Sequence, residues 1–112
     1  MAAVREPKAG VPIIRVFRAR ARAGKERELA DKLANISPTV VKGKPAYLGY
    51  FAGGPAYTDG RDFIFVSMWE SFAGMKGVFG DSWADSHLPD GYRELIEEHS
   101  VDHYELTDRD GR

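Results

Sequence analysis

The sequence predicts an α+β fold in which strands and helices follow one another in the order β-α-β-β-α-β. Three observations carry this prediction. An apolar run ends at Trp69 and passes almost directly to Ser71, a residue type that caps helices. A segment of helical periodicity lies before this junction, between two strand-like runs. A second helical stretch and a last strand follow it, which completes a ferredoxin-like fold with a four-stranded antiparallel sheet.

The first strand and the first helix occupy the N-terminal part of the predicted fold. The strand is expected over residues 12–22, where successive side chains point to opposite faces. The helix is marked by four apolar residues at helical spacing, Leu29, Leu33, Ile36 and Val40. Because Pro38 lacks an N–H, the regular helix is expected to end near Ser37, with a further turn after it.

Two strands and a second helix are expected in the middle of the chain. The strands cover residues 46–52 and 62–69 and are joined by a turn-rich link. Strict alternation along the first of them would place Tyr47 and Tyr50 on opposite faces. The helix after the second of them is expected over residues 72–79.

The C-terminal part predicts one more helix and the last strand. Pro89 suits the first turn of a helix. The buried face of that helix would carry Tyr92, Leu95, Ile96 and His99. The last strand is expected over residues 101–107. The domain therefore spans residues 12–107, with an N-terminal arm at 1–11 and a tail at 108–112.

Composition limits the class of protein. With 112 residues the chain is expected to form one domain with a modest core. The formal net charge is −1, so no nucleic-acid partner is indicated. Cysteine is absent, which excludes disulfides and thiolate sites. With no long apolar segment, the protein is expected in the cytoplasm without a membrane partner. Four arginines of the first strand are expected to face solvent: Arg15, Arg18, Arg20 and Arg22.

The strand that ends at Trp69 is apolar on both faces. Its two sets of side chains are Phe63, Phe65 and Trp69 on one face, and Ile64, Val66 and Met68 on the other. Helices can cover only one face of a four-stranded sheet, and monomers rarely expose a large apolar patch. A homodimer through the open sheet face is therefore predicted.

Three parts of the sequence resemble the antibiotic-biosynthesis-monooxygenase family. They are the junction Phe65-Val-Ser-Met-Trp-Glu-Ser71, the helix-rich segment after it, and the closing Val101-Asp-His-Tyr-Glu-Leu106. The resemblance implies a dimeric α+β barrel over residues 12–107. It also implies several functions, because the family includes cofactor-free oxygenases of aromatic polyketides, heme-degrading oxygenases and proteins that handle signal molecules.

For the cofactor-free oxygenases, the resemblance implies that an electron-rich phenol binds between sheet and helices and reduces O₂ once it is deprotonated. The protein then supplies a dry pocket, a base and hydrogen-bond donors, with no bound cofactor and no metal. His103 and His87 are the candidate bases, because histidine titrates near neutral pH. Tyr47 and Arg18 are further candidates. The substrate pocket is expected to be shaped by Trp69, Trp83, Tyr92, Tyr50, Phe72 and Phe79.

Each candidate also has a structural interpretation. His103 lies in the middle of a strand, where it could make a cross-strand or interface hydrogen bond. His87 could be an exposed residue of the loop before Pro89, and His99 is expected at a helix C-terminus. Trp69 and Trp83 could simply be core residues, since large aromatic side chains dominate burial in small domains.

Heme degradation and metal hydrolysis are disfavoured. Heme-degrading relatives use an Asn on the first strand, which is missing here, and a Trp in the helix after the third strand, where Val78 or Phe79 stands. Only His87 lies at a plausible ligand position, and the histidines show no metal-ligand spacing. Two functions stay open: a cofactor-independent monooxygenase of small hydroxylated aromatics, and a non-catalytic dimeric barrel that binds a small apolar ligand.

Overall fold

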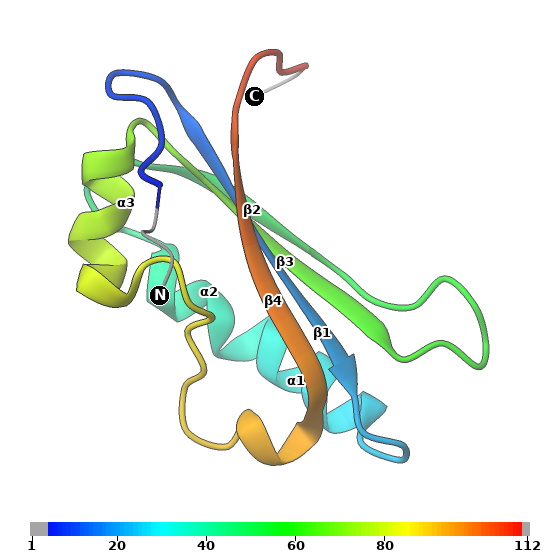
Figure 1. Ribbon diagram of the computed structural model, residues 1–112. Helices are drawn as coiled ribbons and strands as arrows, with labels where there is room; N and C mark the ends of the chain where they lie inside the picture. Colours follow the sequence, from blue (N-terminus) through cyan, green and yellow to red (C-terminus); the bar gives the residue numbers. More distant parts are fainter. Residues whose placement is uncertain (1–4, 111–112) are drawn as a thin grey trace.

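The structure, a computed structural model, describes residues 5–110. Its elements are β1 (Ile13–Ala21), α1 (Glu26–Asn35), α2 (Ser37–Val41), β2 (Tyr47–Gly53), β3 (Asp62–Trp69), α3 (Phe72–Phe79), short 3-10 turns at Gly80–Ser82 and Arg93–Leu95, and β4 (Ile96–Glu105). The strands form one antiparallel sheet in the order β2-β3-β1-β4 (Figure 1). This is the predicted ferredoxin-like arrangement. The predicted arm and tail include residues 1–4 and 111–112, which lie outside the described residues.

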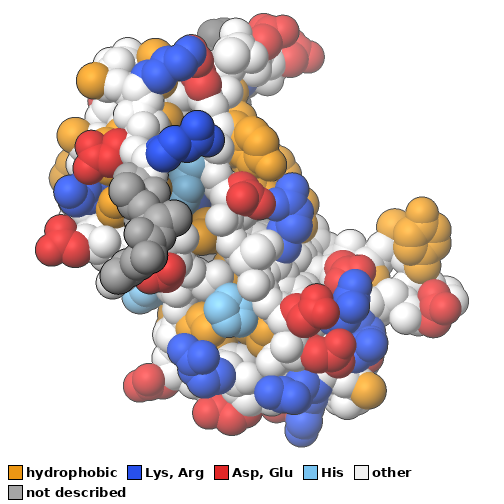
Figure 2. All heavy atoms as spheres, in the orientation of Figure 1, with side chains coloured by type: hydrophobic (Ala, Val, Ile, Leu, Met, Phe, Trp, Pro, Cys, Tyr) orange, Lys and Arg blue, Asp and Glu red, His pale blue; other side chains and the backbone are white. Residues whose placement is uncertain are grey.

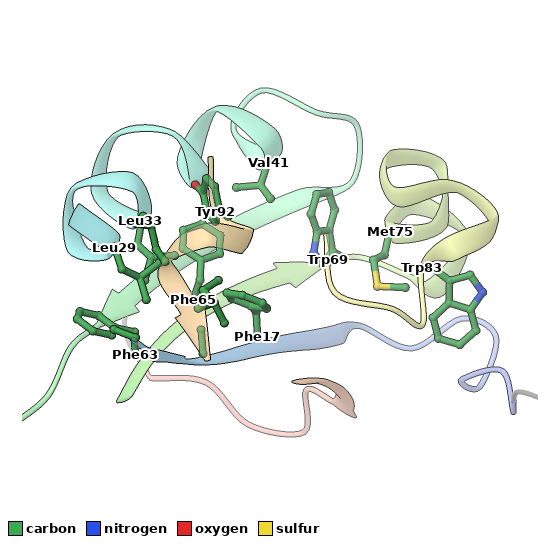
Figure 3. Close-up of a cluster of buried hydrophobic side chains, with 14 of the residues drawn as sticks. Phe17, Leu29, Leu33, Val41, Phe63, Phe65, Trp69, Met75, Trp83 and Tyr92 are labelled. Atoms are coloured by element: carbon green, nitrogen blue, oxygen red, sulfur yellow. The ribbon is translucent and has the colours of Figure 1, made fainter. Parts of the chain in front are cut away.

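The three helices lie on one face of the sheet, and the core fills the space between the two layers (Figures 1 and 3). Phe17 from β1 and Phe65 from β3 enter this layer beneath Leu33 of α1. Trp69 and Met75 fill its other end, and neither has any exposed surface. Because strand side chains alternate between faces, β1 and β3 each send every second residue into this core.

The helix boundaries follow local signals in the sequence. α1 ends at Asn35, and Pro38 lies in the first turn of α2, where a missing N–H costs no hydrogen bond. Ser71 caps α3, because its Oγ accepts a hydrogen bond from the main-chain N–H of Gly74 at 3.1 Å. Gly80, with φ of 74°, ends that helix. The break at Pro38 and the start and end of α3 are therefore confirmed.

The helix predicted from Pro89 does not form. Only the 3-10 turn at Arg93–Leu95 precedes β4, so Ile96 and His99 lie in a strand. β1 presents backbone groups as far as Ala21, and the polar first half of β4 pairs with them. The prediction was wrong because cross-strand hydrogen bonds outweigh the helical spacing of a few apolar residues.

Both tyrosines of β2 lie on the helix side of the sheet, which corrects the prediction that they face opposite sides. The pairing of β2 with β3 shifts between Tyr47 and Gly49, and this bulge changes the alternation of side chains. The Tyr47 ring lies 5.9 Å from that of Trp69, and Tyr50 stacks on Phe65 at 5.2 Å.

The opposite face of the sheet, which we call the open face, carries no helix among the described residues. It is apolar at the end near the C-terminus, where Phe51 and Tyr104 are about half exposed. Cross-strand pairing places Val16 beside Val66 and Ile14 beside Met68 on this face. Toward the other end, near the end of β1, oppositely charged side chains lie together (Figure 2).

Candidate functional site

A small pocket lies between the sheet and the helices, where β1 and β3 face α2 and the segment after α3. The free volume of the pocket is about 40 Å³, enough for a few water molecules. Its apolar wall consists of Phe17, Val40, Val41, Phe65, Phe79 and Pro89. Its polar groups come from Arg15, Ser37, Ser67, His87 and Tyr92. An apolar wall with a few polar groups is typical of small-molecule sites.

Arg15 is the only charged residue among the described residues that line the pocket, and just 4% of it is exposed. Its guanidinium donates hydrogen bonds to the main-chain oxygens of Trp83 and Asp85, the latter at 3.0 Å. Its Cζ lies 3.9 Å from the centre of the Phe79 ring, a cation–π contact. Burial lowers the pKa of Arg15 to about 10, partly opposed by Asp85, so the group stays protonated at neutral pH.

The burial of Arg15 corrects the expectation that all four arginines of β1 face solvent. Arg15 shares its side of the strand with Ile13 and Phe17, which are both buried. That alternation was the available signal. By contrast, Arg18 and Arg20 face solvent as expected, and each of them also pairs with a carboxylate.

His103 lies beside Arg15 and outside the pocket. Its Nε2 is 3.0 Å from Nη1 of Arg15 and accepts that hydrogen bond, because a guanidinium can only donate. Desolvation and the charge of Arg15 lower the pKa of His103 to about 4, and Asp102 opposes this. The imidazole is therefore neutral at pH 7. It faces a wider groove along β4, with its ring 5.2 Å from that of Trp83.

His87 lies at the rim of the pocket. Its side chain is exposed to solvent, and its ring centre is 5.9 Å from that of Phe79. Burial and then the charge of Arg15 lower its pKa below the ordinary value. His87 is therefore neutral at pH 7 and free to accept a proton, which is the state that a general base needs.

The six aromatic pocket candidates divide into two groups. Phe79 and Tyr92 line the pocket. The Tyr92 hydroxyl lies 2.7 Å from Ser37 Oγ and donates to the Lys32 carbonyl at 3.0 Å, which ties α1 and α2 to the turn before β4. Its burial raises the pKa of Tyr92.

The remaining four candidates do not belong to the pocket lining. They are Trp69, Trp83, Tyr50 and Phe72, all of which are core or core-edge residues. The Trp69 indole donates to Ser67 Oγ at 2.9 Å, and the Phe72 and Trp83 rings meet edge to face at 4.9 Å.

The further candidates Tyr47 and Arg18 do not line the pocket, and neither does His99. Arg18 pairs with Asp102 on the open face at 3.2 Å, and His99 forms a hydrogen bond with Ser86 at 2.9 Å. Sequence reasoning missed Ser37, Ser67 and Arg15 as pocket residues. Ser67 lies on the same face of β3 as Phe65 and Trp69, so the alternation of the strand indicates which way its side chain points. Ser37 reaches the pocket only through the packing of α2, which no pattern in the sequence indicates.

No helix within residues 5–110 is long and apolar enough to cross a membrane. The described residues also contain no group of three histidine or carboxylate side chains that could hold a metal ion.

Comparison with known proteins identifies the fold. No protein-family model and no curated protein matches the sequence. A candidate antibiotic biosynthesis monooxygenase from Deinococcus radiodurans superposes with a TM-score of 0.67 at 16% identity, over 89% of this chain and 97% of that one. A second one, from Chloroflexus aurantiacus, gives 0.62 at 18% identity, over 89% and 97%.

A heme-degrading protein from Mycobacterium tuberculosis also superposes, with a TM-score of 0.60 at 20% identity over 89% of this chain and 99% of that one. Structural neighbours across most of the chain thus include candidate antibiotic biosynthesis monooxygenases and a heme-degrading protein, which confirms the predicted resemblance in fold. The pocket does not fit a heme, because its space holds only a few waters.

Proposed function

We propose that the protein is a cofactor-independent monooxygenase that acts on a small hydroxylated aromatic compound in this pocket. The observation that carries the proposal is the pairing of a neutral histidine at the rim, His87, with apolar walls and a buried cation, Arg15. Structural neighbours named as antibiotic biosynthesis monooxygenases support the same class of reaction.

In the proposed reaction His87 accepts the proton of a phenolic hydroxyl. The electron-rich phenolate then reduces O₂, so the substrate supplies the electrons. One oxygen atom enters the ring and the other leaves as water, which takes up the two hydrogens that the phenol loses on becoming a quinone. Apolar walls favour this course because they exclude water from the reduced oxygen intermediate.

The size of the pocket limits the substrate to a single ring. Even a single ring needs more room than a few waters, so the Val40 side chain must rotate when it enters. Val40 is only partly buried, which leaves it space to do so.

Oxygen uptake tests the proposal. Purified protein is mixed with monocyclic phenols and hydroquinones, and dissolved O₂ and quinone absorbance are followed together. One O₂ is expected per quinone formed. His87→Ala should lower kcat by roughly 10²-fold or more, the usual loss when a general base is removed. His99→Ala, in a histidine outside the pocket, should keep wild-type kcat.

A second function is favoured by one observation: the wall of the pocket is mostly apolar, formed by side chains such as Phe17, Val41 and Phe65. We propose as the alternative a non-catalytic barrel that binds a small apolar ligand. Saturable binding of monocyclic aromatics with no O₂ uptake above the buffer rate would support it and would rule out the oxygenase.

We also propose that two copies of the chain pack through their open faces. The support is the apolar end of that face, where Phe51 is 53% and Tyr104 50% exposed. Monomers rarely expose a large contiguous apolar patch, and such a patch marks a site of protein–protein contact. A symmetric pair would cover the same patch on both copies at once.

A further inference from the structure

We infer that Arg15 anchors an anionic oxygen of the ligand, so that the pocket selects small aromatic anions, phenolates or carboxylates, over neutral molecules of the same shape. The inference rests on the pocket proposed above as the substrate site and names the chemical class that it takes. It goes beyond the reaction itself, because recognition of an anion needs neither O₂ nor turnover.

The first argument is charge. Arg15 is buried, yet none of the ion pairs among residues 5–110 includes it, whereas Arg18, Arg20 and Arg61 each pair with a carboxylate. The charge of Asp85 raises the pKa of Arg15, but Asp85 contacts the guanidinium through its main-chain oxygen. A buried cation without a counter-ion is costly, and an anion in the pocket would offset that cost.

The second argument is hydrogen bonding. A guanidinium has five N–H donors. Three hydrogen bonds, two from Nη1 and one from Nη2, engage Trp83, His103 and Asp85. The Nε–H and one Nη2–H therefore keep no partner among the described residues. Two free donors on one guanidinium can bind a carboxylate in bidentate fashion, or a single phenolate oxygen.

The third argument is preorganisation. The two main-chain oxygens, the neutral His103 ring and the Phe79 face hold the guanidinium from several directions. All four contacts are with neutral groups, so they fix the position of the cation without cancelling its charge. Arg15 therefore meets an entering anion at little cost in side-chain entropy.

Ligand binding at pH 7, followed by NMR shifts of the protein, tests the inference with benzoate and its neutral analogue benzamide. Wild-type protein should bind benzoate at least about tenfold more tightly, the usual difference for a hydrogen bond to a charged group. Arg15→Gln should remove this preference. Arg18→Gln, the matched change on the opposite face of β1, should keep it.

A second probe distinguishes the two kinds of anion. Bound 4-nitrophenol should show more of the yellow phenolate absorbance than free 4-nitrophenol at the same pH, and Arg15→Gln should abolish the increase. Benzoate preference without this change would restrict the class to carboxylates, and the reverse would restrict it to phenolates.

Equal affinity of the wild-type protein for benzoate and benzamide, with no change in nitrophenolate absorbance, would overturn the inference and leave Arg15 as a structural tie between β1 and residues 83–85. This comparison needs no variant, so it stands even if Arg15→Gln fails to fold. Anion preference without O₂ uptake would leave the inference intact while the proposed oxygenase failed.

Discussion

At the scale of single residues, Arg15 and His103 show how one buried charge organises its neighbours. The alternation of β1 indicates that Arg15 points to the same side as Ile13 and Phe17. Alternation cannot indicate which groups accept hydrogen bonds from the guanidinium, because these acceptors come from residues 68 to 88 positions away in the sequence. His103 is one of these acceptors, and it can act only while it is neutral.

Acid should therefore destabilise the protein through His103. Its pKa is about 4 in the folded protein and about 6.5 when unfolded, so the unfolded state binds the extra proton between these values. The free energy of unfolding should fall as pH drops from 6.5 toward 4, by about 1–2 kcal/mol from this half-buried group. Urea denaturation across this pH range should show that the free energy of unfolding falls less in His103→Gln than in the wild-type protein.

His87→Gln provides the comparison for that experiment. The pKa of His87 is lowered in the same direction and by the same kinds of cause, but the group lies at the rim. The fall in the free energy of unfolding between pH 6.5 and 4 should therefore differ less between wild type and His87→Gln than between wild type and His103→Gln. An identical pH dependence for wild type and His103→Gln would contradict the assignment.

At the scale of elements, local signals placed most boundaries. The Ser71 cap, the break at Pro38 and the end of α3 at Gly80 each rest on interactions within a few residues. The first half of β4 was misjudged, because its strand conformation depends on pairing with a β1 segment that lies far away in the sequence. The α3 helix also contains two glycines whose surroundings differ, Gly74 and Gly77.

Alanine substitutions at these glycines should change stability in opposite directions. A methyl group at Gly74 would collide with the Cβ of Ala46, whose main-chain oxygen is held by the Glu70 N–H at 2.8 Å. Gly74→Ala should lower the free energy of unfolding by roughly 1–3 kcal/mol. At Gly77 nothing lies within 4 Å, so Gly77→Ala should raise it by roughly 0.5–1 kcal/mol. Chemical denaturation of both variants measures this, and the same sign for both would refute it.

At the scale of the whole molecule, the two faces of the sheet differ in what covers them. One face is covered by α1, α2 and α3, and its side chains form the core (Figure 3). The open face keeps apolar side chains without a covering layer in the described chain, with charged pairs at its other end. That distribution favours a partner that presents the same surface.

Sedimentation should accordingly give twice the chain mass of 12.5 kDa at micromolar concentration. Phe51→Glu should shift the protein to monomers, because it would place two carboxylates in a symmetric apolar contact. Ala73→Glu, an exposed position on α3 and away from the open face, should leave the mass unchanged. A wild-type protein that sediments as a monomer would exclude the dimer.

The sequence by itself determined the order of the elements as far as α3, the two faces of β1 and β3, and the resemblance that indicated the fold. These features depend on alternation, helical spacing and caps, which act between neighbours in the chain. Only the tertiary structure decided that Tyr47 and Tyr50 share a face, that β4 begins at Ile96, and that His87 rather than His103 meets the pocket. Each of these depends on strand register or on packing between distant segments, and neither leaves a periodic trace in the sequence.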